Sequence, residues 1–186
     1  MTRTEREKMM AGEPYLASDP ELVTARSRAR SLLRAFNQTG PDELLLRRSL
    51  LTQLLGTVGS DLYIEPPFFC DYGFNIHVGA RVYMNFQCTI LDCNRVEIGD
   101  DVMFGPGVHI YTATHPIDPD ERVEGPELAL PVRIGSRVWI GGRSVICPGV
   151  TIGEGTTIGA GSVVTKDIPP RVLAVGNPCR VIRTLR

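Results

Sequence analysis

A six-residue repeat constrains the fold of this chain more than any other feature. From Ile134 to Pro169 the sequence divides into six units, IGSRVW, IGGRSV, ICPGVT, IGEGTT, IGAGSV and VTKDIP. An aliphatic residue opens each unit, and a small or branched residue takes its fifth position. A unit of this length can hold one short strand and one corner but no helix, which is typical of parallel β-helices. We therefore predict a solenoid of short strands.

The same phase extends toward the N-terminus, through units that open at Tyr72, Val78, Met84, Ile98, Phe104 and Ile110. One unit, ILDCNRVE from Ile90, has eight residues, which we interpret as a strand unit with a two-residue insertion. The pattern is absent over the 18 residues 116–133, which are rich in proline and acid. Loops of this length in compact domains are usually functional or disordered. We expect 116–133 to be an extruded loop.

We predict that residues 1–60 form a helical segment in front of a solenoid that spans 61–186. Asp19 and Pro20 are typical of an N-cap and a first helical position. The apolar face of that helix comprises Leu22, Ala25, Ala29, Leu32, Leu33 and Phe36. Gly40 is expected to end the helix, and Pro41 to begin a second one that carries Leu46, Leu50 and Leu54 and stops at Gly56. Four arginines of the first helix are expected to form a solvated face: Arg26, Arg28, Arg30 and Arg34.

Length and composition exclude several classes of protein. The 186 residues correspond to one domain with a small appendage. A net charge of −1 does not favour nucleic acid or an acidic membrane as a partner. No apolar run reaches transmembrane length, and the N-terminus lacks the apolar core of a signal peptide. The five cysteines show no paired spacing, so we expect reduced thiols in a cytoplasmic protein.

The chain resembles the maltose and galactoside O-acetyltransferases among the hexapeptide-repeat acyltransferases. Besides the repeats, the resemblance rests on EREKMMAGEPYLASDPEL (5–22), IEPPFFCDYGFNI (64–76), NFQCTILD (85–92), THPID (114–118), VWIGG (138–142) and VTKDIPP with GNPCRVIR (164–183). It covers nearly the whole chain and implies a mainly β fold, a left-handed, three-sided parallel β-helix behind a short helical segment. The handedness comes from the resemblance alone, because left-handed crossovers run against the usual chirality. The resemblance also implies acetyl-CoA as donor and a homotrimer whose active sites lie between subunits.

Three histidines are candidates for chemistry: His77, His109 and His115. All three take the sixth position of their units, but only His115 opens the extruded loop. Histidine accepts a proton near neutral pH, which suits activation of a sugar hydroxyl. His115 matches the catalytic histidine of the family, so we expect it to be the general base. His77 and His109 are expected to be surface or hydrogen-bonding residues.

The histidines also permit a metal hypothesis, since similar prisms hold zinc in the γ-class carbonic anhydrases. His77 shares a face with His115 but lies two coils away, roughly 10 Å along the stack. That separation is too large for both to bind one metal within a subunit. We therefore expect the protein to bind no metal. One alternative stays open, a metal site formed between two subunits.

For the acceptor, the candidates are Asn85, Asp71 and Asp92. Asn85 and His115 are predicted to lie on different faces, so they can meet only if a neighbouring subunit packs against the prism, as in a closed trimer. Asn85 matches the NF dipeptide of the family and would orient the acceptor. The alternative is a corner residue in an unusual backbone conformation. Asp71 and Asp92 would accept hydrogen bonds from ring hydroxyls.

The acceptor itself stays open at this stage. Many members of the family have two consecutive acids where this chain has Asp92 and Cys93. The galactoside enzymes also have an acid where this chain has Ala17, and a small hydroxyl residue at position 71. Asp71, in the string CDYG, resembles the maltose-acetylating branch.

For the donor, seven residues are candidates. Five match positions that contact coenzyme A in the family, namely Ala160, Thr165, Lys166, Arg180 and Arg183, and Trp139 and Gly142 are selected for their own chemistry. Trp139 offers a flat apolar face to a pantetheine arm, with interface packing as the alternative. Backbone N–H groups at Gly141 and Gly142 could hold the thioester oxygen as charge develops. Basic side chains suit phosphates, although any single one is by default a solvated surface charge.

We thus predict an acetyl-CoA-dependent O-acetyltransferase that acts on a small sugar. His115 would remove the proton from the acceptor hydroxyl, which attacks the thioester directly, with no cysteine as acyl carrier. Two alternatives stay open. One is an acetyltransferase for an amino acid, an antibiotic or a lipo-oligosaccharide, and the other is a non-enzymatic scaffold.

Overall fold

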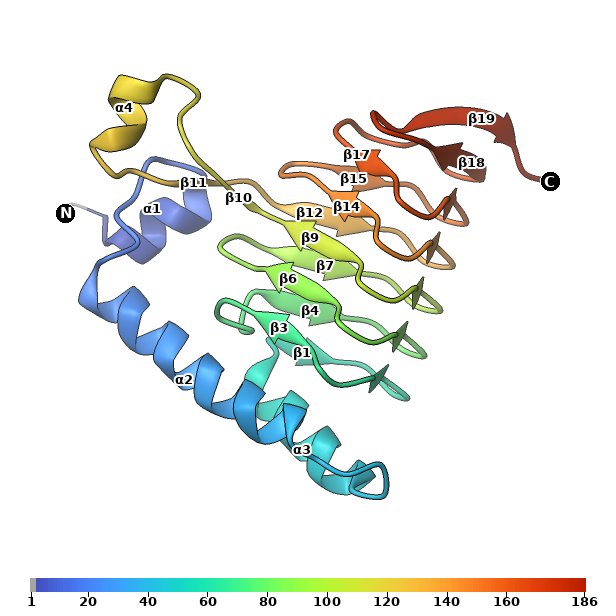
Figure 1. The fold of residues 1–186 in the computed structure, drawn as a ribbon, viewed down its shortest axis with the longest axis horizontal. Coiled ribbons are helices and arrows are strands. Elements are labelled where there is room, and N and C mark those ends of the chain that lie inside the picture. Colours follow the sequence, from blue (N-terminus) through green and yellow to red (C-terminus); the bar gives the residue numbers. More distant parts are fainter. Residues whose placement is uncertain (1–2) are drawn as a thin grey trace.

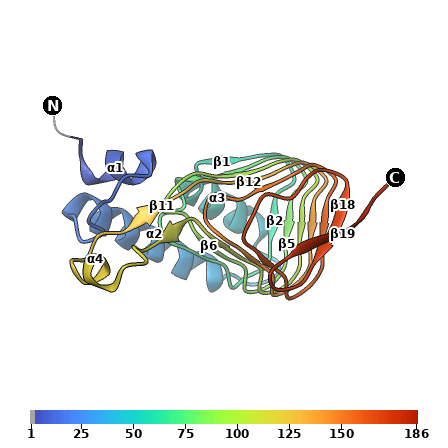
Figure 2. The same cartoon turned by 90° about the horizontal axis from the view of Figure 1, so that it is seen from above.

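A computed structural model describes residues 3–186 and shows a prism with helices beneath one end and along one edge (Figures 1 and 2). The helical segment comprises α1 (Glu5–Ala11), α2 (Pro20–Asn37) and α3 (Leu44–Leu54). The prism is a parallel β-helix with three sides, as the repeat predicts. Within residues 3–186 no helix has the length and apolarity that a membrane crossing requires.

Each side of the prism is a stack of short parallel strands. The first side holds β1 (Thr57–Val58), β4 (Ile76–Val78), β7 (Val96–Ile98), β12 (Val132–Ile134) and β15 (Thr151–Ile152). The second holds β2 (Tyr63–Ile64), β5 (Tyr83–Met84), β8 (Met103–Phe104), β13 (Trp139–Ile140), β16 (Thr157–Ile158) and β18 (Val172–Val175), with β19 (Arg180–Thr184) added antiparallel. The third holds β3 (Phe69–Cys70), β6 (Thr89–Leu91), β9 (His109–Tyr111), β14 (Val145–Ile146) and β17 (Val163–Val164).

The aliphatic residues that open the units fill the interior of the prism. Ile134 pairs with Ile152, Ile140 with Ile158, and Ile146 with Val164, so like positions stack from coil to coil. All six openers and all six fifth-position residues of the repeat between 134 and 169 are buried. Burial of each aliphatic side chain stabilises the fold by roughly 1.5–3 kcal/mol. The repeat therefore forms the core.

The structure corrects the phase of one early unit. Cys70, and not Tyr72, is the inward residue, because it pairs with Ile90 on the third side. Tyr72 instead packs in a separate cluster with Met9, Tyr15 and Leu22. Residues 70–77 thus form a second eight-residue unit, and its insertion lies at the same corner as that of 90–97. The extruded loop leaves the prism at this corner too, since it joins β9 on the third side to β12 on the first.

The extruded loop is more ordered and placed slightly earlier than predicted. It forms a hairpin of β10 (Ala113–Thr114) and β11 (Leu128–Ala129), with the short helix α4 (Pro119–Val123) between them (Figure 1). Val132 and Arg133, predicted to be loop, already belong to β12. All three insertions of the prism therefore gather at one corner.

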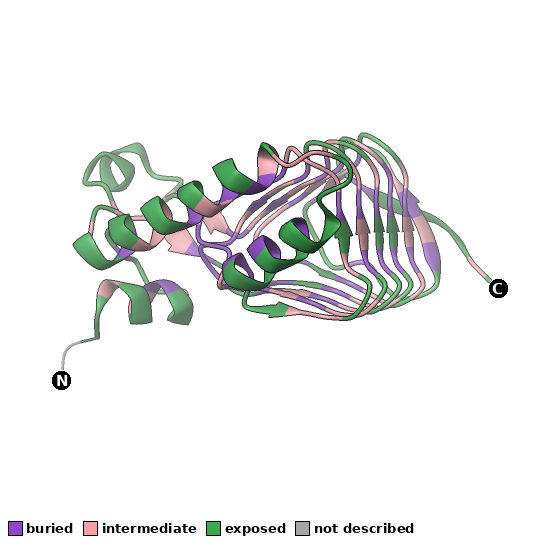
Figure 3. Ribbon diagram, turned by 90° about the horizontal axis from the view of Figure 1, so that it is seen from below, coloured by how far each residue is buried: buried purple, intermediate pink, exposed green. Residues whose placement is uncertain are grey.

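The helices agree with the prediction in most respects. Asp19 caps α2, with its Oδ1 accepting a hydrogen bond from the Glu21 N–H, and Pro20 is the first helical residue. α3, however, begins at Leu44 rather than at Pro41, and Leu46 is exposed because the buried face of α3 carries Arg47, Leu50, Leu51 and Leu54. Figure 3 shows that buried positions of α2 and α3 face the prism. The first strand begins at Thr57, ahead of the expected boundary at residue 60.

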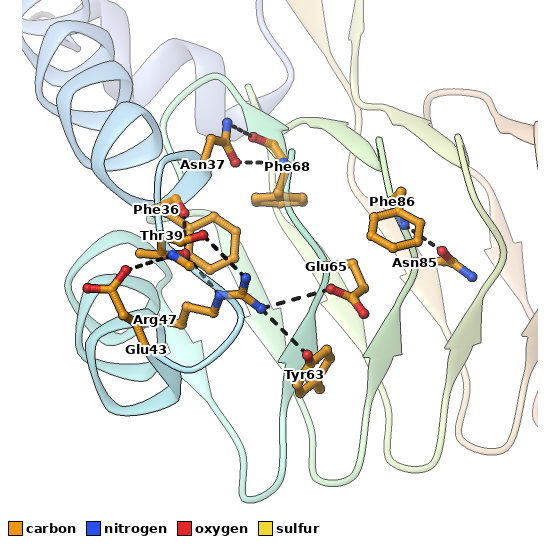
Figure 4. A network of polar contacts seen from close by, with 11 residues as sticks. Phe36, Asn37, Thr39, Glu43, Arg47, Tyr63, Glu65, Phe68, Asn85 and Phe86 are labelled. Carbon is orange, nitrogen blue, oxygen red and sulfur yellow. Dashed lines mark hydrogen bonds and ion pairs between the residues drawn. The ribbon is translucent and has the colours of Figure 1, made fainter.

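Polar contacts hold these helices to the first coil (Figure 4). The buried Arg47 donates from Nε to Thr39 Oγ1 at 2.9 Å, and its Nη1 lies 3.9 Å from the Glu65 carboxylate. Asn37, at the end of α2, both donates to the Phe68 carbonyl and accepts from the Phe68 N–H. The front of the helical segment packs instead against the corner where the insertions gather, with Met9, Tyr15 and Leu22 in one buried cluster with Tyr72 and Cys93.

Candidate active site

A cavity of about 340 Å³ opens between the helical segment and the corner of insertions. The residues that line it come from α2 and the segment before it, from both eight-residue units and from the hairpin: Ala17, Arg26, Arg30, Asp71, Tyr72, Leu91, Cys93, Ala113, His115 and Glu127. The structure therefore brings His115 and Asp71 together, two residues selected from the sequence. It also places Ala17 and Cys93 beside them, the two positions where this chain departs from the galactoside enzymes.

His115 lies on the hairpin, one residue beyond β10, and not at a corner of the prism as its place in the repeat predicted. The reason is that the chain leaves the prism after β9, so the six-residue phase no longer applies. The His115 side chain is exposed and lines the cavity. An imidazole in this position can reach a hydroxyl group of a bound molecule.

Asp71 presents a half-buried carboxylate to the same cavity. Its Oδ2 accepts a hydrogen bond from the Cys93 thiol at 3.4 Å, and within residues 3–186 it forms no ion pair. Burial raises the pKa of Asp71, and the nearby Glu127 adds to this, whereas the Cys93 hydrogen bond and Arg26 oppose it. A carboxylate can accept several hydrogen bonds, so Asp71 has capacity left for ligand hydroxyls.

Asp92 differs from the expectation that it binds a sugar hydroxyl. It has no exposed surface, and its oxygens accept from the backbone N–H groups of Asp71, Tyr72 and Asn75. Burial raises the pKa of Asp92 to about 7. Asp92 thus shapes the insertion that carries Asp71, and it does not line the cavity.

Asn85 lies at another corner of the prism. It follows β5 on the second side and accepts a hydrogen bond from the Phe86 N–H at 2.7 Å (Figure 4). The left-handed backbone angle at this corner belongs to Gln87, with φ 62°, so an unusual conformation does not explain Asn85. Asn85 does not line the cavity of His115, which agrees with the expectation that the two residues do not meet within one subunit.

Three predicted donor residues lie on the second side or at the corner that follows it. Trp139 is half exposed on β13, between Met103 and Thr157 of the neighbouring strands. Gly142 and Ala160 follow β13 and β16 at the same corner as Asn85. Successive coils approach closely there, since a side chain on Gly105 would lie 2.4 Å from the Gly142 nitrogen.

The other donor residues lie toward the C-terminal end of the prism. Thr165 and Lys166 directly follow β17, while Arg180 and Arg183 lie on β19, and all four are exposed. In the described chain none of the three cations forms an ion pair. Lys166, Arg180 and Arg183 are thus available to an anionic ligand.

Comparison with known proteins decides the family. Residues 8–59 match the family described as the maltose acetyltransferase hexapeptide capping motif, and 131–166 match the bacterial transferase hexapeptide family of six repeats. Nodulation protein L of Rhizobium meliloti is 52% identical over 97% of this chain and 99% of its own. The chain belongs to the maltose and galactoside O-acetyltransferase family.

Solved structures of this family share the fold over the whole length of this chain. The crystal structure of a maltose O-acetyltransferase from Clostridium difficile 630 superposes with a TM-score of 0.99 at 52% identity and covers all of both chains. A galactoside acetyltransferase in complex with coenzyme A superposes with a TM-score of 0.96 at 43% identity, covering 100% of this chain and 92% of the other. The predicted fold and family are therefore confirmed.

The other two histidines, His77 and His109, lie outside the cavity that His115 lines. His77 Nδ1 lies 3.3 Å from Thr57 Oγ1 on the first side, and burial lowers its pKa. His109 Nδ1 lies 2.5 Å from the Tyr111 hydroxyl on the third side. Among residues 3–186 no three histidine, cysteine or acidic side chains lie close enough together to hold a metal ion.

Sequence reasoning missed Arg26 and Glu127 as cavity residues. Arg26, expected on a solvated face, donates to the Tyr72 hydroxyl at 2.7 Å and to the Ala17 carbonyl at 2.6 Å. Its spacing from Arg30, one helical turn, places both on one face of α2, which was the available signal. Glu127 lies in the extruded loop, where no repeat predicts which residues face the cavity. Only the observed pairing of the hairpin shows that Glu127 does.

Proposed function

We propose that this protein transfers an acetyl group from acetyl-CoA to a hydroxyl of a small sugar, with His115 as the general base. The observation that carries the proposal is that His115 and the carboxylate of Asp71 line one cavity at the base of the extruded loop. The kinship with maltose and galactoside O-acetyltransferases supports both the reaction and the acceptor class.

The reaction then proceeds by direct transfer. The His115 imidazole takes the proton of the acceptor hydroxyl as its oxygen attacks the carbonyl carbon of the thioester. A new C–O bond forms, the C–S bond of the tetrahedral intermediate breaks, and the imidazolium returns its proton to the departing thiolate. Asp71 accepts a hydrogen bond from a second hydroxyl and orients the sugar. A positioned base of this kind contributes about 10²–10⁴-fold in rate.

The donor binds along the prism toward its C-terminal end in this proposal. Lys166, Arg180 and Arg183 are exposed and carry charges that suit the phosphates of coenzyme A. Trp139 offers its open face to the pantetheine arm, and the Gly142 N–H approaches the thioester oxygen, because the Gly141 N–H already donates to the Ile158 carbonyl. The related structure solved with coenzyme A supports acetyl-CoA as the co-substrate, and we propose that no metal takes part.

The proposal includes a homotrimer with shared sites. Asn85 and the donor residues beside it lie at one corner, whereas His115 lies on a loop that leaves from another. The second side also presents an outward apolar row in which Tyr63, Met103 and Trp139 are 38%, 52% and 52% exposed. Packing this row against a neighbour in a closed ring brings Asn85 of one subunit to His115 of the next. The five cysteines are free thiols, which supports a cytoplasmic location.

Release of coenzyme A in the presence of different acceptors tests the proposal. We expect release with one or more of maltose, glucose and simple galactosides, and a turnover in His115→Ala that is about 10²–10⁴-fold lower. His77→Ala and His109→Ala are matched controls and should stay within a few-fold of the parent. No release with any sugar, or near-parental turnover in a folded His115→Ala protein, would contradict it.

A further inference from the structure

The position of His115 is set by its backbone, because in the described residues no hydrogen bond fixes its imidazole. That backbone directly follows a very short ladder, in which Ala113 pairs with Ala129 and Thr114 with Leu128. A ladder of two pairs is marginal on its own. Contacts with other segments of the protein must therefore hold the hairpin in place.

Asn94 forms hydrogen bonds to both sides of the base of this hairpin, on β11 and just before β10. Its side-chain Nδ2 donates to the Ala129 carbonyl at 2.8 Å, on β11. Its backbone N–H donates to Thr112 Oγ1 at 2.8 Å, on the residue before β10. Asn94 and Thr112 are buried, at 3% and 0% exposed, and buried hydrogen bonds of this kind are costly to lose.

The same amide also binds the helical segment. Asn94 Nδ2 donates to the Met9 carbonyl at 3.1 Å, near the end of α1, and this carbonyl also accepts from the Gly12 N–H that caps the helix. The same segment also holds the hairpin at Glu127, the residue before β11, since the Tyr15 and Glu127 backbones exchange two hydrogen bonds and the Tyr15 hydroxyl donates to Glu127 Oε2. The register of the hairpin places His115 opposite Glu127, next to this second attachment.

We propose that Asn94 is a positioning residue for His115: its side-chain amide holds the catalytic hairpin against the prism and α1. This inference rests on the proposed function of His115 as a base. Asn94 does not line the cavity, so it acts through the hairpin and not on the substrate. Loss of its amide donor should lower turnover and leave binding of acetyl-CoA unchanged.

The isosteric variant Asn94→Asp tests the inference, because it places an oxygen against the carbonyl oxygens of Ala129 and Met9. Asn37→Asp is the matched control, since Asn37 also donates to a carbonyl, that of Phe68, and ties a helix to the prism away from the hairpin. We expect kcat to fall at least tenfold in Asn94→Asp with an unchanged KM for acetyl-CoA, and to stay within a few-fold of the parent in Asn37→Asp. Asn94→Ala is the milder variant if Asn94→Asp does not fold.

A second readout does not depend on activity. Trypsin cleavage after Arg122, which lies on α4 within the loop, should be faster in both Asn94 variants than in the parent or in Asn37→Asp. Parental kcat in a folded Asn94 variant, or equal cleavage in all proteins, would overturn the inference. If the parent shows no acetyl transfer, the proposed function fails, and cleavage after Arg122 still decides whether Asn94 holds the hairpin.

Discussion

His115 lies opposite Glu127 across the hairpin, and both side chains line one cavity. The register that pairs Ala113 with Ala129 and Thr114 with Leu128 makes these two residues the next opposing positions. Glu127 Oε2 accepts from the Tyr15 hydroxyl, so the carboxylate is held at the wall of the cavity. A molecule bound beside His115 in this cavity therefore also lies near the Glu127 carboxylate.

The first prediction follows from this arrangement. Glu127→Gln keeps an oxygen for the Tyr15 hydroxyl but removes the charge that strengthens hydrogen bonds to sugar hydroxyls. We expect the KM for the acceptor to rise about tenfold, since hydrogen bonds to charged groups contribute roughly 1.5–3 kcal/mol, with the KM for acetyl-CoA unchanged. Steady-state kinetics with each substrate varied in turn measures both constants. Glu124→Gln, an exposed change on the same loop, is the control, and equal acceptor constants in both variants would refute the role.

Neutralisation of the donor cations is the second prediction. Lys166, Arg180 and Arg183 are exposed and unpaired within the described chain, so their replacement should leave the fold intact. Each phosphate contact that is lost should raise the KM for acetyl-CoA about tenfold, with a smaller effect on the acceptor. Arg48→Gln, on α3 beneath the other end of the prism, is the control, since Arg48 is also exposed and forms no ion pair in the described chain. An unchanged donor constant in all three variants would place the coenzyme elsewhere.

The third prediction concerns stability and pH. Because burial raises the pKa of Asp92 from 3.8 to about 7, the folded protein keeps a proton that the unfolded chain has lost between these values. The free energy of unfolding that Asp92 contributes is therefore present below pH 4 and is lost as the pH rises through 7. Relative to Asp92→Asn, the parent should lose on the order of 4 kcal/mol over this range. Urea denaturation from pH 4 to 8 measures this, and parallel curves for the two proteins would contradict it.

Much of the fold follows from the sequence because the repeat specifies the core directly. Ile134, Ile140 and Ile146 each open one unit of the repeat, and each is buried on a different side of the prism. The phase could not be followed through the insertions, where spacing no longer reports which residue faces inward. The repeat phase therefore predicts Tyr72 in the core of the prism, although Tyr72 packs against the helical segment and Cys70 takes the inward position.

The candidate site was predicted less completely than the fold. His115 and Asp71 were found because matching strings flank them. Asp92 has the same chemistry as Asp71, and only the structure shows that its oxygens are turned to backbone N–H groups. Arg26 reaches the cavity through a tertiary contact with Tyr72 that no local pattern encodes. Site residues that depend on how separate segments pack are thus beyond sequence periodicity.

We propose that His115 of one subunit and Asn85 of its neighbour complete each active site. Mixing His115→Ala and Asn85→Ala subunits, after unfolding and joint refolding, tests this shared site. Each variant should be nearly inactive alone. In a random trimer about one interface in four combines an intact His115 with an intact Asn85, so an equal mixture should recover about a quarter of the parental turnover. No recovery in mixed trimers of confirmed composition would contradict the shared site.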